Sequence, residues 1–344
     1  MKTRGVSTMK IIQAYNAEDA FYKGIKLFYE EGVSVVSRGL RTLEVPRPVC
    51  TVYENPVQRI IMNPVRDINP FLFFFESLWV LAGRQDVGFL ELFNKRMREF
   101  SDNGHTFHAA YGHRLRHHFN NDQIKEVINL LRKKPDTRQA VLQIWDCEKD
   151  LNVSSRDIPC NNLVYFKIRN GHLNMTVCCR SNDFLWGVTG ANVVQFSVLQ
   201  EYISLCLNVQ IGIYRQISDS FHVYLDGPGG DAWNKVRSIQ NPYKNVYDSL
   251  KIIPFPLFQP QDLNEFNEDL YIFFTHHDEG KSVQPDIFFT PYFKELVPIL
   301  YNAWLIHKDS KEGFRYLNLT VDDQYKNIDW IVACKNWLQR REAQ

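Results

Sequence analysis

The stretch Arg180-Ser181-Asn182-Asp183-Phe184-Leu185-Trp186-Gly187 begins twenty residues after an isolated Pro159-Cys160 pair. It places an arginine, a serine, an acid and a glycine close in sequence to a candidate nucleophilic thiol. The guanidinium of Arg180 is a planar, permanently charged fork, and with the Ser181 hydroxyl beside it suits a phosphate monoester. The alternative interpretation is a strand-end arginine that pairs with Asp183.

Cys160 is the candidate nucleophile of this region. A thiolate is a strong nucleophile, but it is scarce at neutral pH unless cations lie nearby. Arg180 can supply one if the two strands on either side of the Gly171 turn pair antiparallel. Taken alone, a single cysteine is more often a buried structural residue, so this assignment depends on the motifs around it.

Helical and extended patterns are mixed along the chain without a βαβ rhythm, so we expect an α+β fold. The turn sequence Arg169-Asn170-Gly171-His172 predicts a hairpin. Helical spacing predicts helices over residues 16–36, 68–82, 122–133 and 193–207. Strand patterns occur at residues 140–145, 163–168, 173–179 and 209–217.

The last third of the chain is less regular. The acidic segment 261–269 looks like a connection, whereas residues 291–307 and 322–341 look like two closing helices. We therefore expect a catalytic domain over residues 1–225. Residues 226–344 are expected to form a divergent, helical C-terminal extension that packs on the same domain.

Composition excludes several classes of protein. The chain has 344 residues, of which 44% are hydrophobic, so it can bury a large core. Forty basic and 39 acidic residues give a formal charge of +1, which argues against direct nucleic-acid binding and against a polybasic membrane anchor. A local basic pocket for one phosphate is still compatible with this balance.

The signals for location and cofactors favour a cytoplasmic protein without a metal. Residues 1–5 lead into mixed sequence rather than an apolar secretion signal, and the apolar stretch 70–75 is far too short to span a bilayer. The seven cysteines include no CxxC pair and are expected to be reduced, with Cys178 and Cys179 on opposite faces of a strand. No Cys/His group has metal-ligand spacing, and no GxGxxG follows a strand.

Three further polar groups suit a nucleotide. His222 and Tyr224 alternate, so both face one side of a strand and can hold a sugar hydroxyl together, unless they form an interface pair. Asn192 offers both a donor and an acceptor to a pyrimidine edge, and it could also cap a helix. Arg138 is a second phosphate candidate, with a plain surface arginine as the alternative.

Glu76 lies in the aromatic and apolar segment from Phe73 to Trp79. A carboxylate in such surroundings is costly to ionise, so it is either paired or has a raised pKa that is useful for proton transfer. Tyr111, which stands before Gly112, has the least independent support among the candidates.

Several segments, taken in type and order, resemble the thymidylate synthase family, which includes the pyrimidine nucleotide hydroxymethylases. The resemblance covers roughly residues 35–225, about half of the chain. Its segments are residues 75–83, 111–112, 135–145, 159–160, 180–183 and 222–224.

The resemblance implies an α+β homodimer with a mixed sheet, packed helices and shared active sites. Cys160 would attack C6 of a pyrimidine deoxynucleoside monophosphate, and 5,10-methylenetetrahydrofolate would supply a one-carbon unit to C5. Glu76 would organise waters and proton transfer, and Tyr111 would assist removal of the C5 proton. The folate side of the site would include Asp183, Trp79 and Gly187.

The resemblance also assigns the substrate contacts. His222 and Tyr224 would hold the ribose, and Asn192 would read the base. The phosphate cradle would consist of Arg180, Ser181, Arg138 of the partner subunit, and either Arg38 or Arg41.

Departures from the synthase pattern bear on the product. Synthases pass a hydride from the folate to the methylene and form dTMP and dihydrofolate, whereas hydroxymethylases let water add. Polar or smaller groups here would admit water or weaken hydride transfer, so we predict hydroxymethylation and keep a synthase as the alternative. The departures are Asn161 for the usual histidine, Asp157 for a leucine, Met97 for a tryptophan, Gln139 for a second arginine, a longer loop at 187–192, and no apolar tail at 340–344.

The choice of base rests on Asn192. An amide at this position resembles the uracil readers of the family, whereas cytosine readers carry an acid, so we predict dUMP. If the loop aligns without a gap, Ala191 takes the position and a dCMP hydroxymethylase stays open. A non-catalytic nucleotide-binding relative is a further alternative, against which the intact Cys160 and Glu76 argue.

Overall fold

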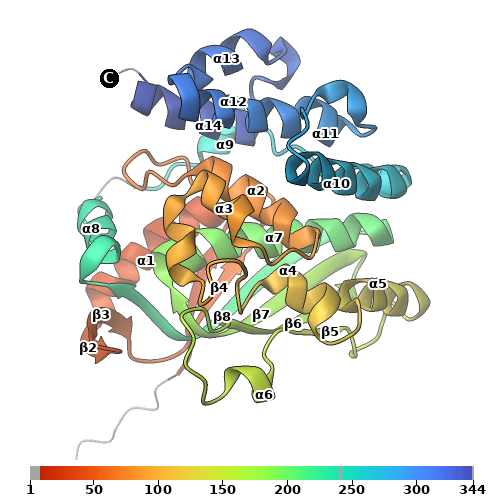
Figure 1. Cartoon of the computed structure of the whole chain (residues 1–344). Coiled ribbons are helices and arrows are strands. Elements are labelled where there is room, and N and C mark those ends of the chain that lie inside the picture. Colours follow the sequence, from red (N-terminus) through yellow and green to blue (C-terminus); the bar gives the residue numbers. More distant parts are fainter. Residues whose placement is uncertain (1–7, 240–241, 343–344) are drawn as a thin grey trace, which may run out of the picture.

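The computed structural model describes residues 8–239 and 242–342, and one mixed sheet of eight strands runs through this part of the chain. The α+β prediction is confirmed (Figure 1). The strands are β1 (Lys10–Ala14), β2 (Val33–Ser37), β3 (Leu40–Val45), β4 (Val49–Tyr53), β5 (Val141–Gln143), β6 (Asn161–Arg169), β7 (His172–Asp183) and β8 (Gln210–Tyr224).

The long strand β8 organises the sheet. The main order is β1-β4-β8-β7-β6-β5, and β3 pairs with the last part of β8. β8 runs parallel to β7, whereas β7 and β6 form the antiparallel hairpin that the Gly171 turn predicts. In the β7–β8 register Ser181 lies opposite Ser220 and Asp183 opposite His222. The two motifs that lie about forty residues apart in the sequence thus become neighbours in the sheet.

The helices pack around this sheet and around one another. Within the described residues, no helix is long and apolar enough to cross a bilayer. The α-helices are α1 (Ala17–Glu31), α2 (Pro70–Leu81), α3 (Val87–Phe93), α4 (Tyr111–His113), α5 (Gln123–Lys133), α6 (Cys147–Asp150), α7 (Ala191–Leu207), α8 (Gly227–Val236), α9 (Val246–Ser249), α10 (Leu263–Asp278), α11 (Pro291–Glu295), α12 (Val297–Ser310), α13 (Gly313–Thr320) and α14 (Asp329–Glu342).

Helix α2 is buried along its whole length. Asn69 accepts hydrogen bonds from the first free N–H groups, Pro70 occupies the first turn, and Gly83 follows the helix with a positive φ of 72°. One side of α2 packs against α7, and the C-terminal helices α12 and α14 contact it as well. Glu76 is therefore fixed in the interior, on a helix that cannot shift without disturbing both layers.

Residues 246–342 add a helical layer over α2 and α3, which is the upper layer in Figure 1, whereas α8 packs against β8 beside the sheet. Aromatic rings join the layers: Phe71 lies 5.3 Å from Trp304, and Phe74 lies 5.1 Å from Trp330, between ring centroids. The expected connection over residues 261–269 is wrong, because α10 begins at Leu263. Its apolar residues Phe266, Leu270, Phe273 and Phe274 recur at helical spacing and are buried behind the acidic start. The proposed boundary at residue 225 stays a prediction.

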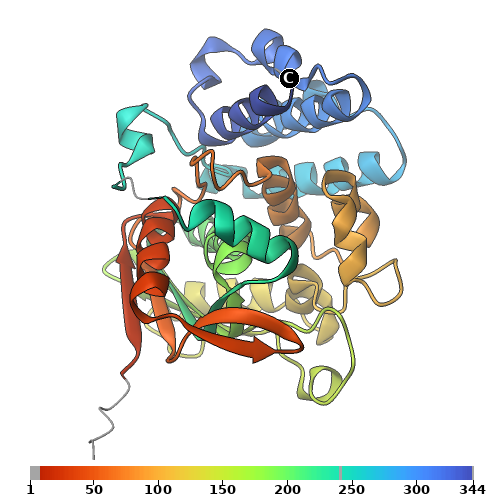
Figure 2. The same ribbon diagram turned by 90° about the vertical axis from the view of Figure 1, so that its left-hand side faces the viewer.

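The helix expected over residues 16–36 ends at Glu31, and the chain continues as the β2–β3 hairpin (Figure 2). The turn between these strands is Arg38-Gly39, with positive φ values of 50° and 78°. Such a two-residue turn matches the twist of the strands. It carries Arg38 towards the end of β8, as described below.

Candidate active site

Cys160 and Arg180 are held together across the β6–β7 hairpin. The backbone N–H of Arg180 donates to the carbonyl of Cys160 at 2.9 Å, which confirms the antiparallel arrangement. The guanidinium donates through Nε to Pro159 O at 2.8 Å and through Nη2 to Ile158 O at 2.9 Å. Arg180 therefore binds the segment that leads to the thiol. The alternative, a pair between Arg180 and Asp183, is absent from the contacts among the described residues.

Opposing effects act on the Cys160 thiol. Burial raises the pKa of Cys160, the positive charges of Arg180 and Arg38 oppose this rise, and the acids Asp157 and Asp183 add to it. The two arginines thus stabilise the thiolate in an otherwise unfavourable environment. All seven cysteines are free, and Cys178 is partly buried beside the buried Cys179, as expected.

The structure separates the two N-terminal arginine candidates. Arg38 Nη2 donates to the Tyr224 hydroxyl at 3.1 Å, and its charge acts on the thiol of Cys160. Arg41 instead forms an ion pair with Asp226, with Nη2 2.6 Å from Oδ1. Arg38 is therefore the candidate that faces the site.

Arg138 does not reach this site within its own chain. It is exposed on the loop before β5, the strand at the edge of the sheet. None of the contacts among the described residues links it to Cys160, Arg180 or Ser181. This position is compatible with a role across an interface, which the single chain leaves as a prediction.

His222 and Tyr224 share one face of β8 with Ser220, as their alternation predicts. The two rings stand perpendicular with centroids 5.4 Å apart, and Nδ1 of His222 lies 3.2 Å from Ser220 Oγ. Ser220 in turn donates to Glu44 on β3 at 2.7 Å. This polar row begins opposite Ser181 and ends at Arg38, which gives it the length and chemistry for a sugar phosphate.

Asn192 lies inside the first turn of α7 rather than at its cap, which is Gly190. Its Nδ2 donates to Asn182 Oδ1 at 3.3 Å, and Asn182 Nδ2 donates to Ser218 Oγ at 3.0 Å. Gly187 makes room for this amide pair, because a Cβ there would lie 2.0 Å from Asn182 Oδ1 and 2.9 Å from Asn192 Nδ2. Sequence reasoning did not assign Asn182 or Ser218, although Asn182 stands within the opening motif.

Asp183 ends β7 and caps the turn η3 (Phe184–Val188). Its Oδ1 accepts from the N–H groups of Leu185 at 2.7 Å and Trp186 at 2.9 Å. Burial raises the pKa of Asp183, and nearby His222 and Arg66 oppose the rise. Arg66, which the sequence did not single out, also donates to the carbonyl of Leu185.

The predicted folate residue Trp79 and the unpredicted Trp186 differ in accessibility. Trp79 is 3% exposed and donates from Nε1 to Asp86 Oδ1 at 3.2 Å, so its indole is part of the core. Trp186, on η3 beside Gly187, is 41% exposed and packs edge-on against Phe73 at 5.8 Å between centroids. The exposed aromatic surface next to Asp183 is therefore Trp186.

Glu76 faces α7 with unsatisfied hydrogen-bonding capacity. Burial raises its pKa to about 7, while a hydrogen bond from Gln195 opposes the rise and the charge of Asp157 adds to it. Glu76 Oε2, Gln195 Oε1 and Asn161 Nδ2 have no partner among the described residues. Buried polar atoms normally find partners, so these three indicate a place for a polar ligand or for waters. Gln195 was not singled out, although it lies one turn after Asn192.

Tyr111 lies at the start of α4 and belongs to the same cluster. Burial raises its pKa well above the usual value, Cys160 and Asp157 add to this rise, and the nearby Asn161 side chain opposes it. Its ring packs 5.6 Å from that of Phe196 on α7, between centroids. The structure thus brings the least supported candidate close to the thiol.

Glu76→Gln should change how stability depends on pH. The folded carboxyl keeps its proton up to about pH 7, whereas the unfolded one loses it near 4.5, so the wild-type loses stability as pH rises through this window. At pH above about 7 the variant is expected to gain roughly 3 kcal/mol in free energy of unfolding relative to wild type, and little below about pH 5. Urea unfolding at several pH values measures this difference.

Glu18 provides the matched control, because burial also raises its pKa to about 7 and it hydrogen bonds to the backbone of Met62 rather than to the site. Glu18→Gln should also make the free energy of unfolding depend less on pH, as Glu76→Gln does. Unlike Glu76→Gln, it should retain turnover. If the free energy of unfolding depends on pH in the same way for wild type and Glu76→Gln, Glu76 ionises normally in the folded protein.

The site brings together a thiol near two arginines, a row of polar groups that suit an anion, and a buried acid. The thymidylate synthase family model matches residues 52–258, so the chain belongs to the thymidylate synthase family.

The chain is similar to three informative proteins. It is 37% identical to the deoxyuridylate hydroxymethyltransferase of Pseudomonas phage M6, over 97% of this chain and 95% of that protein. It is 44% identical to the deoxyuridylate hydroxymethyltransferase of Bacillus phage SP01, over 61% of this chain and 57% of that protein. The fold resembles the crystal structure of thymidylate synthase from T4 phage, with a TM-score of 0.53 and 20% identity over 65% of this chain and 82% of that one. One-carbon transfer is the reaction class that these names share.

Proposed function

We propose that this enzyme hydroxymethylates C5 of dUMP through a covalent adduct with Cys160. The observation that carries this proposal is the set of polar groups near the thiol, where Asn161, Asp157 and Glu76 offer hydrogen-bonding atoms to water. Hydride transfer to a methylene favours an apolar chamber instead. The similarity to two phage deoxyuridylate hydroxymethyltransferases supports the same product and the same base.

The nucleotide would lie along the polar row of β7 and β8. Arg180, Ser181 and Arg38 supply charge and hydroxyl groups for the phosphate, and His222 with Tyr224 supplies groups for the ribose. The Asn192 amide can accept from N3–H and donate to O4 of uracil.

Covalent activation divides the substitution into accessible steps. The Cys160 thiolate adds to C6, which makes C5 nucleophilic, and the thiolate later leaves to restore the aromatic ring. Glu76, with a pKa of about 7, can give or take a proton at the 4-position of the base near neutral pH. Tyr111, whose pKa responds to the charge of Cys160, would assist loss of the C5 proton.

Asp183 and its neighbours form the proposed folate side of the site. Asp183 offers a carboxyl beside the exposed ring of Trp186. Gly187 and Trp79 are the further residues that the family resemblance assigns to the folate. 5,10-Methylenetetrahydrofolate supplies an electrophilic one-carbon unit when bound. The buried unpartnered oxygens of Glu76 and Gln195 would then find polar partners on the ligands or their waters.

A direct assay of both bases tests this function. The purified enzyme is incubated with methylenetetrahydrofolate and either dUMP or dCMP, and the nucleotide and folate products are identified by mass spectrometry. We expect a hydroxymethyl product with tetrahydrofolate from dUMP alone. A methyl product with dihydrofolate would assign thymidylate synthase activity, and turnover of dCMP alone would assign the other base. Because the similar hydroxymethyltransferases are phage proteins, we place this reaction in the host cytoplasm.

We also propose a homodimer with shared sites, with which the exposed position of Arg138 is compatible, and mixing two inactive variants tests it. Cys160→Ala lacks the nucleophile and Arg138→Ala lacks the arginine that each subunit would lend, so a mixed dimer holds one complete site. Subunit exchange at equal amounts should restore about a quarter of wild-type activity. The measurement is turnover before and after unfolding and refolding the mixture together.

The control refolds each variant alone and mixes them only for the assay. If the refolded mixture stays at the sum of the separate activities, Arg138 acts within its own chain or not at all.

A further inference from the structure

We propose that Asp157 is a catalytic residue that takes a proton from the water attacking the methylene carbon on C5, and so directs the enzyme to the hydroxymethyl product. This inference rests on the proposed function and assigns the residue that selects between water and hydride.

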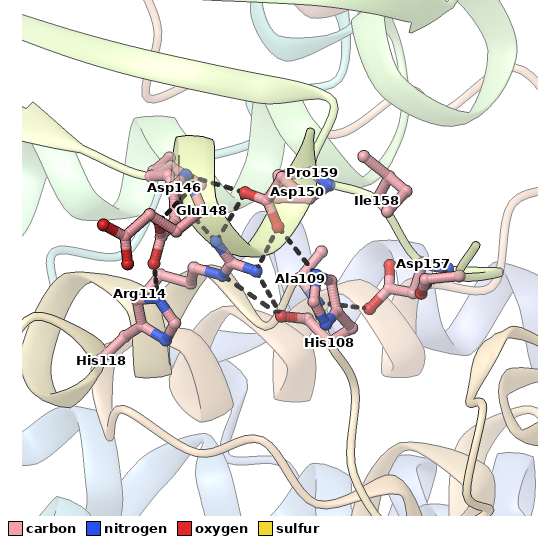
Figure 3. Close-up of polar contacts among 12 residues, drawn as sticks. His108, Ala109, Arg114, His118, Asp146, Glu148, Asp150, Asp157, Ile158 and Pro159 are labelled. Carbon is pink, nitrogen blue, oxygen red and sulfur yellow. Dashed lines mark hydrogen bonds and ion pairs between the residues drawn. The ribbon is translucent and has the colours of Figure 1, made fainter. Parts of the chain in front are cut away.

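Asp157 links the two segments that carry Tyr111 and Cys160. Its Oδ2 accepts a hydrogen bond from the backbone N–H of Ala109 at 2.8 Å (Figure 3). Ala109 stands two residues before Tyr111, and Asp157 stands three residues before Cys160. Nothing in the described part of the chain donates to Oδ1, and the side chain is only partly buried, so this oxygen can hold a water.

A buried ion pair fixes the backbone that holds Asp157. The Arg114 side chain is 1% exposed and bonds both oxygens of Asp150, at 2.7 and 2.8 Å, and also the carbonyl of His108 at 2.9 Å. The His108 ring completes the network, with Nε2 2.8 Å from Asp150 Oδ1 (Figure 3). Because the partners of Arg114 are buried and specific, the Ala109 N–H has a defined direction.

The other side of the segment is anchored by Asp102. Its oxygens accept from Ser155 Oγ at 2.6 Å and from the backbone N–H of Arg156 at 2.9 Å. Asp157 is thus held between two networks, and neither network uses its free oxygen. A general base must be held in a fixed position to accept a proton from a bound water, and these two networks hold Asp157 in such a position.

The groups around Asp157 are the ones to which the proposed function assigns the reaction. Its negative charge raises the pKa of Glu76, of the Cys160 thiol and of Tyr111, so the Asp157 carboxylate acts electrostatically on all three groups. Burial raises the pKa of Asp157 itself, and His108 and Arg114 oppose the rise. A more basic carboxylate is a better proton acceptor near neutral pH.

The step balances without an oxidant or reductant. Water oxygen bonds to the methylene carbon while one O–H proton passes to Asp157 Oδ1. The electron pair of the exocyclic double bond shifts to C5 and the 4-carbonyl, then returns to form C5=C6 as the C6–S bond to Cys160 breaks. The proton on Asp157 finally neutralises the released thiolate.

Asp157→Asn and Asp157→Leu separate this step from those before it. Release of tritium from dUMP labelled at C5 reports formation of the methylene, and hydroxymethyl dUMP reports its capture by water. Under single-turnover conditions, with enzyme in excess over the labelled dUMP, we expect tritium release to stay within about tenfold of wild type while hydroxymethyl product falls by roughly 100-fold. Asp157→Glu should restore part of the product because it restores the carboxylate.

Asp102→Asn is the matched control, since it weakens the same segment without removing the candidate base. A structural role for Asp157 would lower tritium release and product together, as in this control, and would overturn the inference. Wild-type product formation by Asp157→Leu would overturn it as well. If wild type itself makes methyl dUMP, the proposed function fails and Asp157 has no water to activate; failure confined to the variants concerns Asp157 alone.

Discussion

Cys160→Ala is expected to abolish both product formation and tritium release from C5-labelled dUMP, by at least about four orders of magnitude. Without the sulfur, C5 of the base is not nucleophilic and no later residue can compensate. Binding of dUMP should persist, because Arg180, Arg38 and the row on β8 remain in place. Calorimetric titration with dUMP and the tritium assay together measure the two effects.

Cys178→Ala is the matched control for this prediction. Cys178 is a free, partly buried thiol on β7, two residues before Arg180. Its removal should leave turnover within a few-fold of wild type. Measurable turnover by Cys160→Ala would exclude the covalent mechanism, whatever the product.

Asn192→Asp is expected to shift the ratio of kcat/KM for dUMP over dCMP by roughly 100- to 10,000-fold towards dCMP. Uracil presents a donor at N3 and an acceptor at O4, which an amide can match. Cytosine presents an acceptor at N3 and a donor at the 4-amino group. A carboxylate offers only acceptors, so it repels O4 of uracil and accepts from the 4-amino group of cytosine.

The neighbours of Asn192 can accommodate a carboxylate, so the substitution tests the reading of the base directly. Asn182 now accepts from the Asn192 amide, and it can rotate its own amide to donate to a carboxylate instead. Asn192→Ala is the control, which should lose discrimination and activity with both bases. An unchanged preference in Asn192→Asp would show that another residue reads the base, as it would if the loop placed Ala191 there.

Local patterns predicted the elements that carry the site. The Gly171 turn predicted the β6–β7 hairpin, and alternation predicted that His222 and Tyr224 share a face of β8. The apolar run around Glu76 predicted a buried helix, which the structure has, and either a paired carboxyl or a raised pKa, of which burial favours the second. In each of these cases, neighbours in the sequence determine the environment of the residue.

Contacts between distant segments could not be read from the sequence. The hydrogen bond from Ala109 to Asp157 and the ion pair of Arg114 with Asp150 join segments that no periodicity connects. Arg38 and Arg41 look equivalent in sequence, and only the Arg38-Gly39 turn and the Asp226 ion pair distinguish them. Helix α10 was not predicted because its acidic first residues look like a loop, although apolar residues follow them at helical spacing.

The central claim is that water captures the methylene on C5, and turnover in heavy-oxygen water tests it most directly. The wild-type enzyme is supplied with dUMP and methylenetetrahydrofolate in this solvent, and the mass of the nucleotide product is measured by mass spectrometry. We predict hydroxymethyl dUMP with one heavy oxygen per molecule, formed together with tetrahydrofolate. A methyl product free of solvent oxygen, formed together with dihydrofolate, would contradict the account.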